Sequence, residues 1–127
     1  KITIKLQIGN ALAFVNDKEY RLDAPPYIKN SRTMLRMRFI GEAFGAVVGW
    51  VEDKKMVTYD FETIHIELII SDKRALVRRG EKSETIELDV APEIIAGRTF
   101  VPLRFVSETL GAEVEWIAET KSIIVKK

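Results

Sequence analysis

The chain has 127 residues, of which 46% are hydrophobic and 31% are charged, a composition typical of one globular domain and not of a disordered segment. Twenty basic residues against nineteen acidic residues leave a net charge of +1, and the two signs alternate without forming the basic cluster typical of nucleic-acid binding. There is no cysteine, which excludes disulfide bonds and thiolate metal sites, and no apolar run approaches the roughly 20 residues that span a bilayer. We therefore expect no nucleic-acid partner and no membrane insertion.

The first predicted strand lies at the start of the chain. Over residues 1–8, hydrophobic residues at even positions alternate with polar ones, which is the period of a strand with one buried face. Because Lys1 leads directly into this pattern, we expect the chain to be part of a longer protein. Segments 11–15 and 19–22 predict a hairpin, with turn-forming residues at 16–18.

Two short helices are predicted, over residues 36–44 and 102–110. Pro102 suits the first helical position, where its missing N–H costs nothing. Gly45 and Gly111 follow the helices at the place where a left-handed cap is expected. One apolar face is expected on each helix, formed by Met37, Ile40 and Phe44 in the first and by Leu103, Val106 and Leu110 in the second.

Charged residues four positions apart recur on both predicted helices. Arg38 with Glu42, and Arg104 with Glu108, can pair along the helix surface. We interpret these pairs as structural, because positions repeated in both helices preserve a fold more often than they mark a site.

Two strands are predicted after each helix, over 48–50 and 57–59 in the first half of the chain and over 114–116 and 123–125 in the second. Trp50 and Trp116 each lie two residues after a valine and therefore on the same strand face as that valine. This favours a core position for both indoles over a sugar-stacking platform. On that interpretation Trp116→Ala leaves a cavity and costs ~3–5 kcal/mol.

The sequence repeats itself. Residues 22–59 align without gaps on residues 88–125, with an offset of 66 positions and 14 identities among 38 pairs. Upstream the offset falls to 62, so the second copy carries four extra residues between Val77 and Leu88. We interpret this insertion as a longer surface hairpin loop.

These patterns predict an α+β fold with antiparallel β-sheets and short helices, arising from the internal duplication of a strand-rich unit that contains one helix. The predicted organisation is one compact module, 1–127, made of two repeats, 1–62 and 63–127.

The segment GRTFVPLRFVSETLGAEVEW, from Gly97 to Trp116, is followed by the strand KSIIV. It resembles the repeat of the copper amine oxidase N-terminal-like domain, also called a stalk domain, through its Gly-Arg-Thr, Val-Pro-Leu-Arg, Leu-Gly-Ala and Val-x-Trp elements. In the first copy Ser31, Arg36 and Phe44 replace the glycine, the proline and a leucine of this pattern. The resemblance implies antiparallel sheets packed with helices, a module without chemistry of its own, and a secreted or cell-surface location in bacteria.

Few side chains offer catalytic chemistry. The copper site of an amine oxidase is expected to use three histidines and a modified tyrosine that follows an asparagine, but His65 is the only histidine and no Asn-Tyr pair exists. His65 is expected to be solvated, on the polar face of its strand. None of the common nucleophile-elbow, phosphate-loop, zinc-protease or dinucleotide motifs is present. We predict no enzyme activity, no metal and no cofactor, with a carboxylate-based hydrolase as the alternative.

The expected function is that of a non-catalytic extracytoplasmic accessory module, either a stalk or spacer or a cell-wall-associated domain. Its partner is expected to be cell-wall polysaccharide or an adjoining domain of the same polypeptide, and the alternative is a carbohydrate- or peptidoglycan-binding module. Arg32 and Arg98, ahead of the helices, are the candidates for binding an anionic glycan or carboxylate. Tyr20, Tyr27 and Phe61 are the candidates for stacking on sugar rings.

Overall fold

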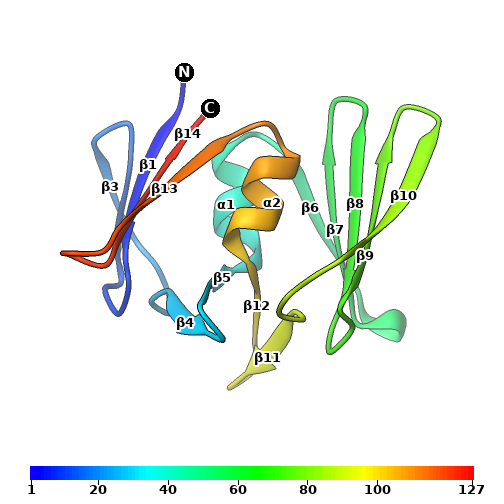
Figure 1. Ribbon diagram of the computed structural model, residues 1–127, viewed down its shortest axis with the longest axis horizontal. Helices are drawn as coiled ribbons and strands as arrows, with labels where there is room; N and C mark the ends of the chain where they lie inside the picture. The colour runs from blue at the N-terminus through cyan, green and yellow to red at the C-terminus, as the bar shows by residue number, and fades with distance from the viewer.

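The computed structural model describes residues 1–127 and consists of three antiparallel sheets and two short helices (Figure 1). Helices α1 (Met37–Ala43) and α2 (Leu103–Thr109) lie side by side in the middle of the molecule. A four-stranded sheet lies below them in Figure 1, and a five-stranded sheet flanks them on either side. The expected architecture of antiparallel sheets with short helices is therefore confirmed.

The first flanking sheet has the order β13-β14-β1-β2-β3 and consists of β1 (Thr3–Gln7), β2 (Leu12–Val15), β3 (Lys18–Arg21), β13 (Glu113–Ile117) and β14 (Ser122–Lys126). The second has the order β10-β9-β8-β7-β6 and consists of β6 (Val47–Val51), β7 (Met56–Phe61), β8 (Ile64–Ile69), β9 (Arg74–Arg79) and β10 (Lys82–Glu87). The central sheet has the order β11-β12-β5-β4 and consists of β4 (Tyr27–Lys29), β5 (Arg32–Arg36), β11 (Glu93–Ile95) and β12 (Arg98–Pro102). One turn of 3-10 helix, η1 (Glu52–Lys54), joins β6 to β7.

Every sheet combines strands from both halves of the chain. β1 pairs with β14 at the far end of the sequence, and β8 pairs with β7 across the midpoint. In the central sheet β5 pairs with β12, and Leu35 lies opposite Val101. These two residues are also aligned with each other at the offset of 66, so the halves meet at equivalent positions.

One hydrophobic cluster fills the space between the sheets and the helices, and it draws on both halves. Tyr59 is its largest fully buried side chain, and the Tyr59 hydroxyl donates a hydrogen bond of 2.7 Å to the carbonyl oxygen of Met37. The predicted apolar helix faces are confirmed, because their residues are all buried: Met37, Ile40, Phe44, Leu103, Val106 and Leu110.

The helix ends agree with the sequence within one residue. Gly45 and Gly111 have φ values of 87° and 98°, the left-handed region, which confirms the predicted caps. Pro102 lies just before α2, at the N-cap, and not at the first helical position. The segments ahead of the helices form two short hairpins, β4–β5 and β11–β12.

The four extra residues of the second half lie in strands, which corrects the expected longer loop. β2 and β3 have four residues each, whereas β9 and β10 have six, and both hairpins turn through two residues. Adding two residues to each strand keeps the alternation of side chains and leaves the tight turn unchanged. Asn16 and Asp17 form the turn between β2 and β3 with φ values of 50° and 69°, as the turn prediction requires.

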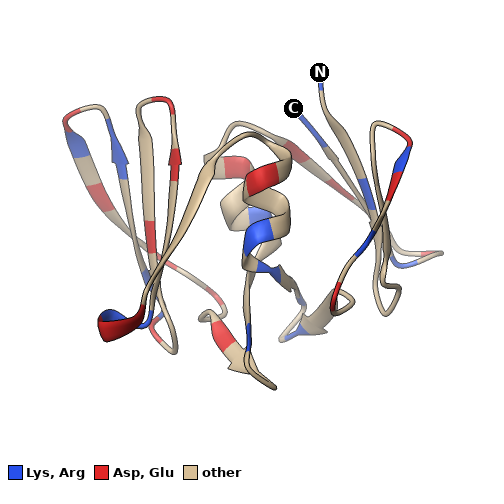
Figure 2. Cartoon of the chain, turned by 180° about the vertical axis from the view of Figure 1, so that it is seen from behind, with Lys and Arg blue, Asp and Glu red and all other residues tan.

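Positive and negative side chains are interspersed over all three sheets (Figure 2). No helix of the structure has both the length and the apolar character needed to cross a membrane.

Gly41 of α1 packs against Tyr59 so closely that an added Cβ would lie 2.7 Å from Tyr59 Cε1 and 2.7 Å from Val48 Cγ2. Both neighbours are buried and cannot move aside easily. We therefore expect Gly41→Ala to lower the free energy of unfolding by about 1–3 kcal/mol through overpacking, in spite of the higher helix propensity of alanine. Urea denaturation measures the change, and an unchanged midpoint would contradict this packing.

The position aligned with Gly41 in α2 is Ser107, whose hydroxyl is buried without a hydrogen-bond partner. Because an unsatisfied buried polar group is costly, Ser107→Ala is expected to raise the free energy of unfolding by about 1 kcal/mol. The two alanine variants should thus shift the urea midpoint in opposite directions. A lower midpoint for Ser107→Ala would mean that the hydroxyl is bonded in solution.

Candidate functional site

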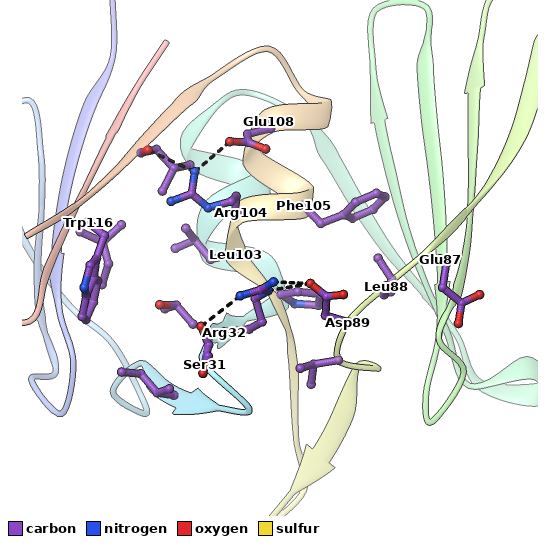
Figure 3. Close-up of a pocket in the computed structure, with 16 residues that line it drawn as sticks. Ser31, Arg32, Glu87, Leu88, Asp89, Leu103, Arg104, Phe105, Glu108 and Trp116 are labelled. Atoms are coloured by element: carbon purple, nitrogen blue, oxygen red, sulfur yellow. Dashed lines mark hydrogen bonds and ion pairs between the residues drawn. The ribbon is translucent and has the colours of Figure 1, made fainter. Parts of the chain in front are cut away.

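A groove with a volume of about 520 Å³ runs along α2 (Figure 3). In Figure 3, Trp116 stands at one end of the groove, Arg104 and Leu103 of α2 form the middle, and Leu88 lies toward the other end. The volume lies within the range of about 300–1,000 Å³ that is typical of small-molecule sites, and half of the lining residues are hydrophobic. The groove is therefore the candidate site of this chain.

Trp116 is the most exposed aromatic residue of the groove, with a relative exposure of 41%, so the prediction that it lies in the core is wrong. The alternation along β13 places Trp116 on the same face as Val114, which does pack against the core. The core does not extend as far as Trp116, so that end of the face lines the groove. Trp50, the aligned residue, does pack against the core.

The indole N–H of Trp50 is hydrogen-bonded within the protein, whereas that of Trp116 is not. The Nε1 atom of Trp50 donates a hydrogen bond of 2.8 Å to Glu52 Oε1. The residue aligned with Glu52 is Ala118, which has no acceptor side chain, and the indole of Trp116 makes no hydrogen bond within the protein. Trp116 therefore has a free donor beside an exposed ring.

Arg104 and Arg38 fasten the helices to the strands that follow them. Arg104 donates to Glu108 at 3.0 Å and to the carbonyl oxygen of Val114 at 3.3 Å. Arg38 lies 3.6 Å from Glu42 and donates to the carbonyl oxygen of Val48 at 2.9 Å. The predicted ion pairs along both helices are confirmed, and their guanidinium groups also bind the edges of β13 and β6.

Both arginines proposed as anion ligands already have carboxylate partners in the other half of the chain. The Nε atom of Arg32 donates to Asp89 at 2.8 Å, and the Nε atom of Arg98 lies 3.5 Å from Asp23. Asp23 also accepts from Arg36, and that hydrogen bond holds the pKa of Asp23 below its ordinary value, against the smaller effect of burial. An anionic ligand would have to compete with these pairs.

The three candidate stacking residues lie on three different strands. Tyr20 is 39% exposed and contacts Phe39 edge-on, with ring centroids 6.3 Å apart. Tyr27 donates a hydrogen bond to Glu93, and burial, followed by that bond, raises the pKa of the Tyr27 hydroxyl. Phe61 packs against the core below the amine of Lys127, which lies 4.4 Å from its ring centroid.

Of the five predicted site residues only Arg32 lines the groove, so the structure does not bring them together. Sequence reasoning missed Trp116 as a site residue because its alternation pattern matches that of a core residue. The signal that could have identified it is the absence of an acceptor at Ala118, where the aligned position in the first half is Glu52.

His65 lies between two carboxylates and is only 16% exposed, which corrects the expectation of a solvated side chain. Its Nδ1 atom is 2.6 Å from Asp60 Oδ1, and its Nε2 atom is 3.0 Å from Glu67 Oε2. Burial lowers the pKa of His65, but the hydrogen bonds with Glu67 and Asp60 together outweigh it and raise the pKa above the ordinary value. No group of three or more His, Cys, Asp or Glu residues in the structure is arranged to hold a metal ion.

Comparison with protein families identifies a family model that matches the chain over two overlapping stretches. A family model described as the copper amine oxidase N-terminal domain matches residues 1–59 and residues 23–125. The second match runs from the segment before β4 into β14, so it includes the central sheet, both helices and the whole of the Trp116 groove. No curated protein and no solved structure matches the chain.

His65 gives the folded state a pH dependence whose sign follows from the raised pKa. Its contribution to stability is fully present below the unfolded pKa of about 6.5 and is lost as the pH rises through the folded pKa. His65→Gln should therefore cost more stability at about pH 5 than at about pH 8. Urea denaturation at both values measures the difference, and Asp60→Asn should remove part of the same dependence. An equal cost at the two pH values would show that the two carboxylates do not hold the imidazolium.

Proposed function

This chain belongs to the copper amine oxidase N-terminal domain family, and on that premise we propose that it is an accessory module of a larger exported bacterial protein, associated with the cell wall. The family is one of non-catalytic N-terminal domains, which supports an accessory role for the chain. The observation that carries the proposal is the family match over residues 23–125, which includes nearly every element outside the first hairpin.

The path of the chain favours a module displayed at the side of its partner over a stalk that spaces two neighbours apart. β1 and β14 are adjacent antiparallel strands. Ile2 and Lys127 exchange two backbone hydrogen bonds of 2.9 and 2.8 Å, and the two ends lie together in Figure 1. A segment joined to β1 and a segment joined to β14 would therefore be attached at the same end of the module. The module would then project sideways from the polypeptide and would add little to its length.

The proposal includes the internal duplication. The order of three strands, a short hairpin, a helix and two strands occurs twice along the chain. The central register supports the same interpretation, because Met34 lies opposite Pro102 and Arg36 lies opposite Phe100, which are equivalent pairs under the offset of 66. Superposition of residues 2–59 on residues 64–125 in an experimental structure tests the duplication, and halves with different folds would contradict it.

Carbohydrate binding is the second candidate function, and the specific observation that favours it is the exposed indole of Trp116 in the groove. Flat aromatic side chains with an apolar face and a polar edge are suited to sites that are partly wet. A binding module of this kind and a wall-associated accessory module are compatible in one chain.

Co-sedimentation with purified Gram-positive cell walls tests the proposed function. We expect the chain to pellet with the walls at about 0.15 M salt and to remain bound when the salt is raised to about 1 M, since a chain with a net charge of +1 has little long-range attraction for salt to screen. An unrelated globular protein of similar size and charge serves as the control. A chain that stays in the supernatant, or one that releases soluble fragments from the walls, would contradict a non-catalytic wall module.

A further inference from the structure

We propose that the groove along α2 binds a neutral oligosaccharide, with the indole of Trp116 as its stacking platform. The inference rests on the proposed accessory function and names the ligand class and the residues for it. Its three supports are the exposed ring, the polar groups beside it and the difference between this face and the aligned face of the first half.

The ring provides the apolar part of the site. Trp116 is 41% exposed and lies outside the core cluster, so a ligand can cover the ring without displacing core residues. Its N–H has no partner in the protein and can donate to a hydroxyl group, and Ile28 and Val114 extend the apolar lining beside it. A sugar ring offers C–H groups on its face and hydroxyl groups on its edge, which match this combination.

Two ion pairs provide the polar part. In Figure 3 the pair of Arg104 with Glu108 lies above, and the pair of Arg32 with Asp89 lies below, the middle of the groove. Each guanidinium has five N–H donors and each carboxylate about four acceptor positions, so one salt bridge leaves several of both kinds unused. Because each pair is held by its own salt bridge, these groups are oriented before a ligand arrives.

The charge balance favours a neutral ligand. Two guanidinium groups, from Arg32 and Arg104, face three carboxylates, from Glu87, Asp89 and Glu108. Both guanidinium groups are already paired, so no free cation is available for a phosphate or carboxylate. A ligand with hydroxyl and amide groups can use the paired residues without separating them.

The aligned groups in the first half of the chain are engaged in contacts within the protein. Arg36 stands where the groove has Pro102, and it donates to Asp23 at 2.9 Å and to the carbonyl oxygen of Thr99 at 2.9 Å. The N–H of Trp50 is bonded to Glu52. The fold therefore does not require an exposed indole with a free donor, and of the two tryptophans only Trp116 of the second half has both features.

Proton–nitrogen correlation spectra test the proposal, because the chain has only two tryptophans and hence two indole N–H signals. Trp50→Phe assigns them. On titration with chitotetraose, a neutral tetrasaccharide, we expect the Trp116 signal to move in a saturable way and the Trp50 signal to stay in place. Movement of the Trp50 signal alone, or no movement up to the solubility limit of the sugar, would overturn the proposal.

Matched variants separate binding from folding. Trp116→Ala should weaken the apparent affinity roughly tenfold or more, Trp116→Phe should retain part of it, and Trp50→Phe should leave it unchanged. Thermal melts show that each variant is folded, and because Trp116 lies outside the core cluster we expect its variants to remain so. Equal affinity in the wild type and a folded Trp116→Ala variant would overturn the proposal.

Other occupants of the groove give different results. A Trp116 signal that moves with a peptidoglycan stem peptide or with inorganic phosphate, but not with chitotetraose, would overturn the choice of a neutral sugar. A signal that moves with protein concentration alone would indicate a second copy of the chain as the occupant, which also overturns it. Tests on cell walls separate this proposal from the previous one: if the wild type pellets with walls but does not bind chitotetraose, the wall function stands and the groove proposal fails. If the wild type binds chitotetraose but not walls, the groove proposal stands and the wall function fails.

Discussion

The antiparallel pairing of β5 with β12 is the contact on which the rest of the structure depends. Leu35 and Val101 face each other there and are both fully buried. Each strand runs directly into a helix, so this pairing also sets α1 beside α2. Each helix then ends at a left-handed glycine and leads into a strand of a flanking sheet. One central register thus positions both helices and both flanking sheets, and with them the groove.

The same arrangement explains why similar halves present different faces. Arg32 reaches Asp89 and Arg98 reaches Asp23, so each half supplies an arginine to a carboxylate of the other. At these positions the two faces are alike. They differ where Arg36 replaces Pro102 and where Glu52 replaces Ala118, because each of these polar side chains engages a neighbour in the first half. These two positions therefore distinguish the two faces by whether a polar side chain is engaged with a neighbour.

Much of the fold could be predicted from the sequence because its signals are local: alternation for the strands, apolar spacing for the helices, and Gly45 and Gly111 for their ends. Strand partners were harder to predict, since in a repeated sequence the partner of β1 could come from either half. The short connection between Phe61 and Ile64 decides this, because those two residues pair directly and make β7 and β8 a hairpin across the midpoint. β14 is then the corresponding partner for β1. The exposure of Trp116 could not be predicted, because alternation indicates the face of a strand but not how far the core extends beneath it.

The end of the core beneath β13, short of Trp116, has a physical consequence for the site. Ile123, which pairs with Trp116 across β13 and β14, is buried and belongs to the core cluster, whereas Trp116 does not. The packing of the sheet is therefore complete without the indole. Trp116 can therefore change with little loss of stability, whereas Leu35, Val101 and Tyr59 cannot. A module built in this way can keep its framework while exposed groove residues such as Trp116 change.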